Sequence, residues 1–191
     1  MTLRIILPVK PFDEAKQRLA PAMPAAARAR LAEEMFRHVF ATVVDFAGPP
    51  AIIVISRGAD VLDYVGTRGA TALAERSPSD LNGALRQASA FAQDAGASKL
   101  LVLASDLPLL CEADLTALAR HDCAIAPDRH GRGTNALLWP TSPLPDFHFG
   151  EDSFSRHRAA ARAVGLDPQT VLSAGLAHDV DLPSDLIGPT K

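Results

Sequence analysis

Three short apolar runs constrain the fold of this chain more than any other feature of its sequence. They span 3–9, 51–55 and 99–104, and each is followed by polar or turn-forming residues. Runs this short and this rich in Ile, Leu and Val are typical of strands. Because such strands are apolar on both faces, they belong to a parallel sheet that is covered on both sides.

Helical patterns separate these strands. Apolar residues recur every four positions from Leu31 to Val43, after Pro24 and before Gly48, which predicts a helix with a broad buried face. The other elements expected in this half are a short helix, a short strand and a second amphipathic helix, at 59–65, 70–74 and 81–91. The alternation of strand and helix predicts an α/β fold with a mainly parallel sheet.

The second half of the chain is less regular. Short apolar runs predict strands at 123–126, 135–139, 170–173 and 177–180, and a loop followed by a helix is expected within 150–164. We find no repeat and no linker composition, so residues 1–191 are expected to form a single domain.

Composition narrows the class of protein. The chain is 48% hydrophobic and carries a net charge of -3, which is ordinary for a globular protein and argues against a nucleic-acid partner. No run approaches the roughly 18 apolar residues of a membrane helix, so no membrane partner is expected. Cys111 and Cys123 form no metal motif, and we expect two buried, reduced thiols in a cytoplasmic protein.

Polar residues follow the predicted strands at their carboxyl ends. Lys10, Ser56, Arg57 and Asp106 all occupy such positions. Ligands of open parallel sheets bind outside this edge, so these residues indicate a ligand site.

Three aspartates are candidate magnesium ligands. Asp106 ends a buried strand, while Asp179 and Asp181 are two residues apart and would share one side of an extended segment. Clustered carboxylates need a cation to stay ionised together, and Mg²⁺ prefers such oxygen ligands. The alternative is that Asp106 caps the next turn, that Asp181 caps a helix starting at residue 182, and that Asp179 is solvated.

Other polar segments could hold anions. Lys10, Lys16 and Arg18 form a basic cluster that could embrace a triphosphate or be a solvated loop. Thr134 and Asn135 follow a glycine-rich loop. Gly150 and Ser153 precede a helix, whose N-terminal amides could bind an anion, and Ser153 could equally be its N-cap.

The sequence lacks the motifs of several common kinds of site. There is no Walker A sequence, no dinucleotide fingerprint, no zinc spacing and no convincing catalytic triad. We expect His157 to be a surface or capping-region residue rather than a catalyst.

Several of these segments together resemble the 2-phospho-L-lactate guanylyltransferase family. The resemblance covers nearly the whole chain and depends on the order and spacing of six segments. They are Leu-Pro-Val-Lys-Pro-Phe with Ala-Lys-Gln-Arg-Leu, Leu-Asn-Gly-Ala-Leu, Asp-Leu-Pro-Leu-Leu, Ala-Pro-Asp-Arg-His-Gly, Gly-Thr-Asn and Asp-Val-Asp, at 7–19, 81–85, 106–110, 126–131, 133–135 and 179–181.

The resemblance implies a three-layer nucleotide-diphosphosugar transferase-like fold with a mainly parallel, mixed sheet. It implies a magnesium-dependent transfer of GMP from GTP to a small phosphorylated carboxylic acid, with release of pyrophosphate, in coenzyme F-420 biosynthesis. The acceptor in this family is 2-phospho-L-lactate, phosphoenolpyruvate or 3-phospho-D-glycerate. A homodimer is compatible with this assignment.

The resemblance also implies roles for individual residues. Magnesium would be held by Asp106, Asp179 and Asp181, and the GTP phosphates would face Lys10, Lys16 and Arg18. Asn82 would lie near the nucleoside. The acceptor would be held by Thr134, Gly150 and Ser153, and we place Asn135 in the same substrate-binding set.

Two departures from the family pattern bear on the acceptor. Glu151 and Asp152 stand where the family often has Pro-Gly, and their charge disfavours an anionic acceptor unless it points away or meets a cation. Asp80 and Gly83 replace a common glycine and alanine, and Asp80 is a candidate helix cap.

Other functions stay open. The alternatives are a nucleotidyltransferase for molybdenum cofactor or a sugar phosphate, a non-catalytic nucleotide-binding module, or a phosphatase or kinase. The first alternative is disfavoured because a Gly-x-Gly-x-Arg loop is missing after the first strand. The second is disfavoured because all three aspartates are present, and the third because there is no phosphate-acceptor motif. No residue distinguishes guanine from adenine by sequence alone.

Overall fold

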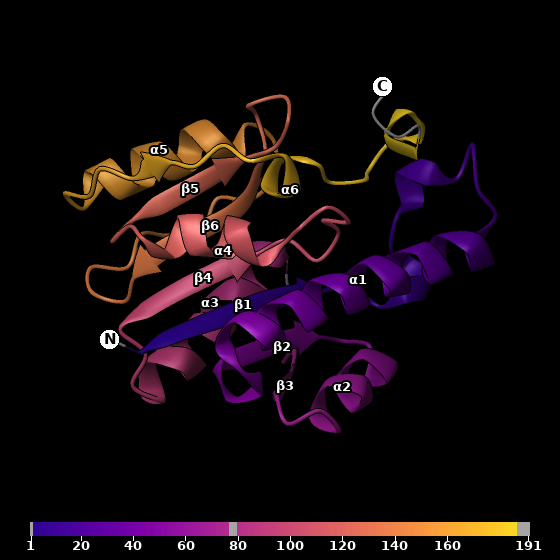
Figure 1. The fold of residues 1–191 in the computed structure, drawn as a ribbon, viewed down its shortest axis with the longest axis horizontal. Coiled ribbons are helices and arrows are strands. Elements are labelled where there is room, and N and C mark those ends of the chain that lie inside the picture. The colour runs from indigo at the N-terminus through magenta and orange to yellow at the C-terminus, as the bar shows by residue number, and fades with distance from the viewer. Residues whose placement is uncertain (1, 77–79, 187–191) are drawn as a thin grey trace.

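A computed structural model describes residues 2–76 and 80–186. Within these residues seven strands form one sheet in the order β3-β2-β1-β4-β6-β5-β7 (Figure 1). The strands are β1 (Leu3–Val9), β2 (Ile52–Ser56), β3 (Thr71–Ala74), β4 (Lys99–Leu103), β5 (Ala124–Pro127), β6 (Thr134–Pro140) and β7 (Gln169–Thr170). β6 runs antiparallel to both of its neighbours, and the other pairs are parallel. The predicted mainly parallel, mixed sheet is confirmed.

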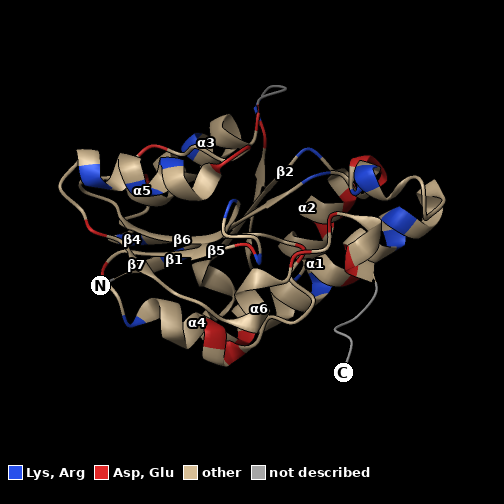
Figure 2. Cartoon of the chain, turned by 90° about the horizontal axis from the view of Figure 1, so that it is seen from above, with Lys and Arg blue, Asp and Glu red and all other residues tan. Residues whose placement is uncertain are grey.

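Helices cover both faces of the sheet, which makes three layers (Figure 2). One face packs against α1 (Ala25–Ala47), α2 (Ala59–Gly66), α4 (Glu112–Ala119) and α6 (Ala174–Ala177). The other face packs against α3 (Leu81–Asp94) and α5 (Ser153–Ala163). Short 3-10 turns lie at Phe12–Glu14, Gln17–Leu19, Pro49–Ala51 and Pro183–Leu186.

The apolar runs fill both layers because successive residues of a strand point to opposite faces. In β1, Ile5 and Leu7 belong to the core under α1, while Ile6 belongs to the core under α3. β4 repeats the pattern, with Leu101 and Val102 on opposite sides. Removing this apolar surface from water is the main favourable term that holds the layers together.

A smaller cluster anchors the segment after α6. Leu19, Met35 and Val180 are buried together, away from the two main cores, with Met23 and Leu31 packed against them. These residues come from the loop after β1, from α1 and from the C-terminal segment. The cluster therefore holds the residues around 16 and 181 near each other.

Some sequence predictions for the second half are wrong. No strand exists at 177–180 within the described part of the chain, where the short helix α6 begins at Ala174. Its cap is Ser173, whose Oγ accepts from the Leu176 N–H at 3.0 Å, so a local polar contact outweighs the short apolar pattern. The strand expected at 170–173 is only Gln169–Thr170.

The region around Cys111 also differs from expectation. The helix α4 was not expected, and Cys111 caps it and is exposed, while Cys123 is buried as expected. The Asp114 carboxylate accepts from the Cys111 N–H at 2.9 Å, which starts the helix without a strong apolar pattern. Along the described residues, no helix is both long and apolar enough to cross a membrane.

The anchoring cluster predicts a large stability difference between two leucine truncations. Leu19 is fully buried, whereas Leu172 is 78% exposed. We expect Leu19→Ala to lower the free energy of unfolding by about 2–5 kcal/mol, because it leaves a cavity. Leu172→Ala is the matched control and should change it by less than about 0.5 kcal/mol. Urea unfolding measures both, and equal effects would contradict the packing described here.

Candidate active site

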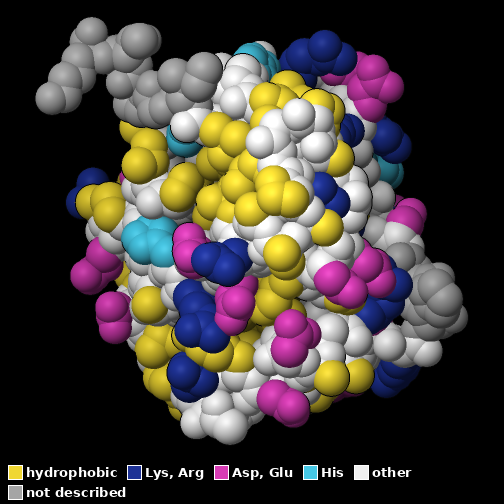
Figure 3. Space-filling view, turned by 90° about the vertical axis from the view of Figure 1, so that its right-hand side faces the viewer, with side chains coloured by type: hydrophobic (Ala, Val, Ile, Leu, Met, Phe, Trp, Pro, Cys, Tyr) yellow, Lys and Arg dark blue, Asp and Glu magenta, His cyan; other side chains and the backbone are white. Residues whose placement is uncertain are grey.

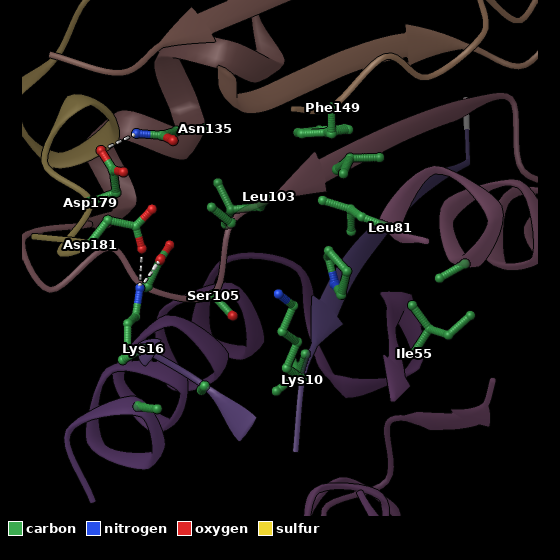
Figure 4. Close-up of a pocket in the computed structure, with 18 of the residues that line it drawn as sticks. Lys10, Lys16, Ile55, Leu81, Leu103, Ser105, Asn135, Phe149, Asp179 and Asp181 are labelled. Atoms are coloured by element: carbon green, nitrogen blue, oxygen red, sulfur yellow. Dashed lines mark hydrogen bonds and ion pairs between the residues drawn. The ribbon is translucent and has the colours of Figure 1, made fainter. Parts of the chain in front are cut away.

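A cavity of about 380 Å³ opens at the carboxyl ends of the central strands. It is charged at one end, around Lys16, Asp179 and Asp181, and apolar at the other, around Leu81 and Phe149 (Figure 4). Figure 3 views the molecule from the side to which β1 points and shows blue and magenta side chains beside a hydrophobic area. The size is within the usual range of small-ligand sites, and the position is the one predicted from the strand ends.

Lys16 joins two of the predicted carboxylates. Its Nζ donates to Asp106 Oδ2 and, at 2.9 Å, to Asp181 Oδ1. The Lys16 side chain is only 8% exposed. The backbone of Lys16 is in the left-handed region, with φ of 53°. Asp106 lies 90 positions after Lys16 in the chain and Asp181 lies 165 positions after it, yet both carboxylates meet at the one Lys16 ammonium group.

This contact balances burial against charge. Burial alone would lower the pKa of Lys16, but Asp106 and Asp181 outweigh it and hold that pKa above its ordinary value. Burial raises the pKa of Asp106, and the Lys16 ammonium opposes that effect. The alternative reading of Asp106 as a turn cap is not what the structure shows, since its carboxylate meets Lys16.

The predicted basic cluster is divided between different environments. Lys10 lines the cavity, points into it in Figure 4, and has no ion-pair partner in the described part of the chain. Arg18 is not among the described residues that line the cavity; its side chain is 75% exposed and lies 3.9 Å from Asp181. Lys10 is therefore the cation placed to meet a ligand, while Lys16 neutralises carboxylates.

Asn135 holds the third carboxylate. Its Nδ2 donates to Asp179 Oδ1 at 3.1 Å and to the Leu176 carbonyl at 2.9 Å. The side chain is buried and lines the cavity, as expected of a site residue. Its amide protons, however, are directed at the protein, so Asn135 positions Asp179.

A clamp that the sequence did not reveal holds Asp181. The carboxylate of Asp185 accepts from the backbone N–H of Asp181 at 2.8 Å and of Leu182 at 2.7 Å, and it pairs with Arg129. Burial would raise the pKa of Asp185, but these hydrogen bonds and Arg129 hold it below its ordinary value. The capping role considered for Asp181 therefore belongs to Asp185, four residues later.

Thr134 and Ser153 lie together beside a buried histidine. Ser153 Oγ is 3.3 Å from Thr134 Oγ1, which is 3.1 Å from Nδ1 of His157. Thr134 lines the cavity, whereas Gly150 and Ser153 are not among the described residues that line it. The expectation that His157 is a surface or capping-region residue is wrong, because it lies within α5, whose N-cap is Asp152, and its side chain is fully buried against β6.

The start of α5 differs from a simple anion site. Asp152 is the N-cap, and Ser153 is the first helical residue. The Ser153 N–H donates to the Gly150 carbonyl at 3.3 Å, and the Phe154 N–H donates to the Arg132 carbonyl at 2.9 Å. These two amides are therefore already paired within the chain. Gly150 has a φ of +125°, a conformation that side chains disfavour.

The two acidic residues of this loop meet a cation. Arg132 Nε donates to Asp152 Oδ1 at 3.0 Å, and its Nη2 is 3.6 Å from Glu151 Oε1. Both carboxylates are more than half exposed. The charge of these two residues disfavours an anionic acceptor unless they meet a cation, and Arg132 is a cation that offsets part of that charge.

Asn82 supports the apolar end of the cavity. Its Oδ1 accepts from the Phe149 N–H at 2.7 Å, and its Nδ2 donates to the Phe149 carbonyl at 3.2 Å. Asp80 caps α3 by accepting from the Gly83 N–H at 2.8 Å, as expected for that residue. Asn82 thus fixes Phe149 opposite Leu81, where a flat apolar ligand group could lie (Figure 4).

The three aspartates have the chemistry of a magnesium site without its convergence. Among the described residues, no three carboxylate, imidazole or thiolate side chains are close enough to bind one metal ion. The donors are nevertheless hard oxygens at the cavity edge, and Asp106 and Asp181 already share one cation, the Lys16 ammonium. That donor set fits Mg²⁺.

The chain has an α/β fold of the nucleotide-diphosphosugar transferase type. A chain from Desulfovibrio desulfuricans G20, assigned as a nucleotide-diphospho-sugar transferase, superposes with a TM-score of 0.71 and 19% identity, covering 97% of this chain and 84% of that one. CMP:2-keto-3-deoxy-manno-octonic acid synthetase, solved with CTP, superposes with a TM-score of 0.60 and 14% identity over 97% and 95% of the two chains.

Sequence similarity identifies the family. Residues 3–188 match the family described as "Guanylyl transferase CofC like", and the chain belongs to it. Phosphoenolpyruvate guanylyltransferases from Sphaerobacter thermophilus and Chloroflexus aggregans are 35% and 39% identical, over 97% and 93% of this chain and 91% of each relative. A 2-phospho-L-lactate guanylyltransferase from Methanothermobacter thermautotrophicus is 35% identical over 95% of this chain and 81% of its own. The resemblance seen in the sequence is confirmed.

The Asp185 clamp predicts a pH-dependent stability effect. Asp185→Asn should lower the free energy of unfolding by about 1–3 kcal/mol at pH 7, because it weakens buried hydrogen bonds to charge. Since the folded-state pKa of Asp185 is lowered, its stabilisation is present above the unfolded pKa and lost as pH falls through the folded one. The difference between variant and wild type should therefore shrink in acid.

Urea unfolding at neutral and acidic pH measures this effect. Asp94→Asn is the control, since Asp94 is exposed on α3 and should change stability by less than about 0.5 kcal/mol. A loss for Asp185→Asn that is the same at every pH would contradict an ionised clamp.

Proposed function

We propose that this protein transfers GMP from GTP to the phosphate of a small phosphorylated carboxylic acid and releases pyrophosphate. Family membership supports the guanylyl donor, and the observation that carries the proposal is the cavity in which Lys10 faces Asp106, Asp179 and Asp181. We take phosphoenolpyruvate as the first acceptor and 2-phospho-L-lactate as the second, because relatives carry these names. The product would enter coenzyme F-420 biosynthesis.

The two ends of the cavity suit the two parts of GTP. The base would lie at the apolar end between Leu81 and Phe149, and the triphosphate would extend toward Lys10. An ammonium group without an ion-pair partner in the described chain has its full charge available for phosphate oxygens. The acceptor would then occupy the region near Thr134.

The reaction needs alignment more than proton transfer. A phosphate oxygen of the acceptor attacks the α-phosphorus of GTP, a new P–O bond forms, and the bond to the pyrophosphate oxygen breaks. The nucleophile is already ionised near neutral pH, so no general base is required. Lys10 would offset charge on the triphosphate while the cavity holds the two reactants in line.

Magnesium would be held by Asp106, Asp179 and Asp181. When bound, it would supply positive charge that stabilises the triphosphate and the leaving pyrophosphate. Lys16 offsets part of the charge of the Asp106 and Asp181 carboxylates, and Asn135 orients Asp179. These contacts hold the three carboxylates at the edge of one cavity.

The acceptor would meet the Thr134 hydroxyl at the other side of the cavity. Thr134 lines this side, Ser153 bonds to it, and Gly150 shapes the loop before α5. Arg132 contacts Glu151 and Asp152 and offsets part of their charge, which weakens the objection to an anionic acceptor. The 3-phospho-D-glycerate acceptor, a homodimer, a cytoplasmic location and a single domain over 1–191 stay predictions.

The function is tested by pyrophosphate release with GTP and Mg²⁺. We expect release with phosphoenolpyruvate or 2-phospho-L-lactate, with ATP and CTP as donor controls and 3-phospho-D-glycerate as a third acceptor. Chelation of Mg²⁺ with EDTA should stop turnover, and added Mg²⁺ should restore it. Folded protein that releases no pyrophosphate with any acceptor would overturn the proposal and favour a nucleotide-binding role.

The carboxylates are tested by charge removal at constant shape. We expect Asp106→Asn and Asp181→Asn to lower kcat by about 100-fold or more, the magnitude typical of losing one group that stabilises transition-state charge. Asp122→Asn is the matched control, because Asp122 is 92% exposed and, among the residues that the structure describes, pairs only with Lys99. Folded Asp106→Asn protein with near-normal kcat would contradict the assignment.

A further inference from the structure

His157 is a buried polar residue that the proposed reaction does not use directly. It lies in α5, and its side chain is fully buried. The ring packs against the rings of Trp139 and Phe149, with centroid distances of 6.4 and 4.7 Å. A buried polar group needs hydrogen bonds to offset the loss of water. Both ring nitrogens of His157 have such partners, and the partners define its protonation.

The backbone determines which nitrogen carries the proton. The N–H of His148 donates to Nε2 of His157 at 2.9 Å, so Nε2 must present its lone pair. The proton of the neutral ring is then on Nδ1, which donates to Thr134 Oγ1 at 3.1 Å. Burial lowers the pKa of His157 to about 3, with His148 and Arg156 adding to the effect, which keeps the ring neutral.

The two hydroxyls beyond this nitrogen form a short chain. Thr134 Oγ1 accepts from His157, and Ser153 Oγ is 3.3 Å from Thr134 Oγ1. The Ser153 hydroxyl donates to Thr134 Oγ1, so of the two hydroxyl protons the one on Ser153 makes the bond between them. The other proton has no acceptor in the described part of the chain. Thr134 lines the cavity, so that proton has a route to a bound ligand.

We propose that His157 is a positioning residue that makes the Thr134–Ser153 hydroxyl pair a donor of one hydrogen bond into the cavity. If Nδ1 carried no proton, it would instead accept the proton of the Thr134 hydroxyl. Thr134 would then have no proton left to donate to a ligand. The partner is an anionic oxygen of the acceptor, a carboxylate or phosphate oxygen. This identification of the partner rests on the proposed function.

The geometry separates this role from catalysis. His157 is fully buried, its Nε2 is bonded to the His148 N–H, and its Nδ1 contacts only Thr134 among the described residues. It therefore touches no reactant and acts through Thr134. Loss of the Nδ1 donor should therefore appear in the binding of the acceptor, whereas the Asn and Gln variants both lose the ring that packs against Phe149 and share any effect on the binding of GTP.

Two substitutions separate the two ring nitrogens. The amide of His157→Asn can take the place of Nδ1 and keep a donor toward Thr134. The amide of His157→Gln can reach the His148 N–H in place of Nε2 but offers Thr134 no equivalent donor. Thr134→Val removes the hydroxyl at nearly constant shape, and His121→Gln, a partly exposed histidine at the end of α4, is the control for the substitution itself.

Steady-state kinetics should show a selective effect. We expect His157→Gln and Thr134→Val to raise the KM for the acceptor about 10- to 100-fold, the range for losing a hydrogen bond to a charged group. Thr134→Val, which leaves the His157 ring in place, should leave the KM for GTP unchanged. His157→Asn should stay within about threefold of wild type, and His157→Gln combined with Thr134→Val should be no worse than either alone. Equal rises in the KM for the acceptor in His157→Asn and His157→Gln, or a rise in the KM for GTP in Thr134→Val that matches its rise for the acceptor, would overturn the proposal.

A second measurement does not depend on activity. Two-bond ¹H–¹⁵N correlation NMR of the ligand-free protein should show the Nδ1-protonated, neutral tautomer of His157 between pH 5 and pH 8. The Nε2-protonated tautomer or a charged ring would overturn the proposal even if GMP transfer is normal. A correct tautomer in a protein without GMP transfer would instead count against the proposed function, and thermal unfolding of each variant confirms that it is folded.

Discussion

The contact on which the site depends is the ammonium group of Lys16 between Asp106 and Asp181. Like-charged groups at the edge of a sheet repel one another, and their pairing with one buried cation is what allows them to be near neighbours. The same contact joins the loop after β1, the end of β4 and the segment after α6. The small apolar cluster of Leu19, Met35 and Val180 holds the same segments together.

Much of the fold could be predicted because its first half obeys local rules. The runs at β1, β2 and β4 are apolar on both faces, as strands between two helical layers must be, and α1 and α3 show clear periodicity. The last third could not be predicted in detail, because its elements are short. α6 depends on a single capping contact of Ser173, and no apolar periodicity in the sequence indicates this helix.

The site was predictable in its position but not in its connections. Lys10, Lys16 and Asp106 could be predicted as site residues from their charge and from their places after the first and fourth strands, since parallel strands bring their carboxyl ends to one edge of the sheet. Which of the lysines would meet a ligand depends on a contact across ninety positions of sequence. The burial of His157 depends on the packing of α5 over Trp139, and the Asp185 clamp depends on Arg129, so neither had a local signal beyond residue type.

The central claim is that the guanylyl group moves to the phosphate of the acceptor, and the product itself tests it most directly. Phosphorus NMR of a reaction with GTP, Mg²⁺ and phosphoenolpyruvate follows every phosphorus atom. The account predicts free pyrophosphate and two new, mutually coupled signals from a diphosphate that joins GMP to the acceptor. A product with GMP on the carboxylate, or GTP that stays intact while the protein is folded, would contradict it.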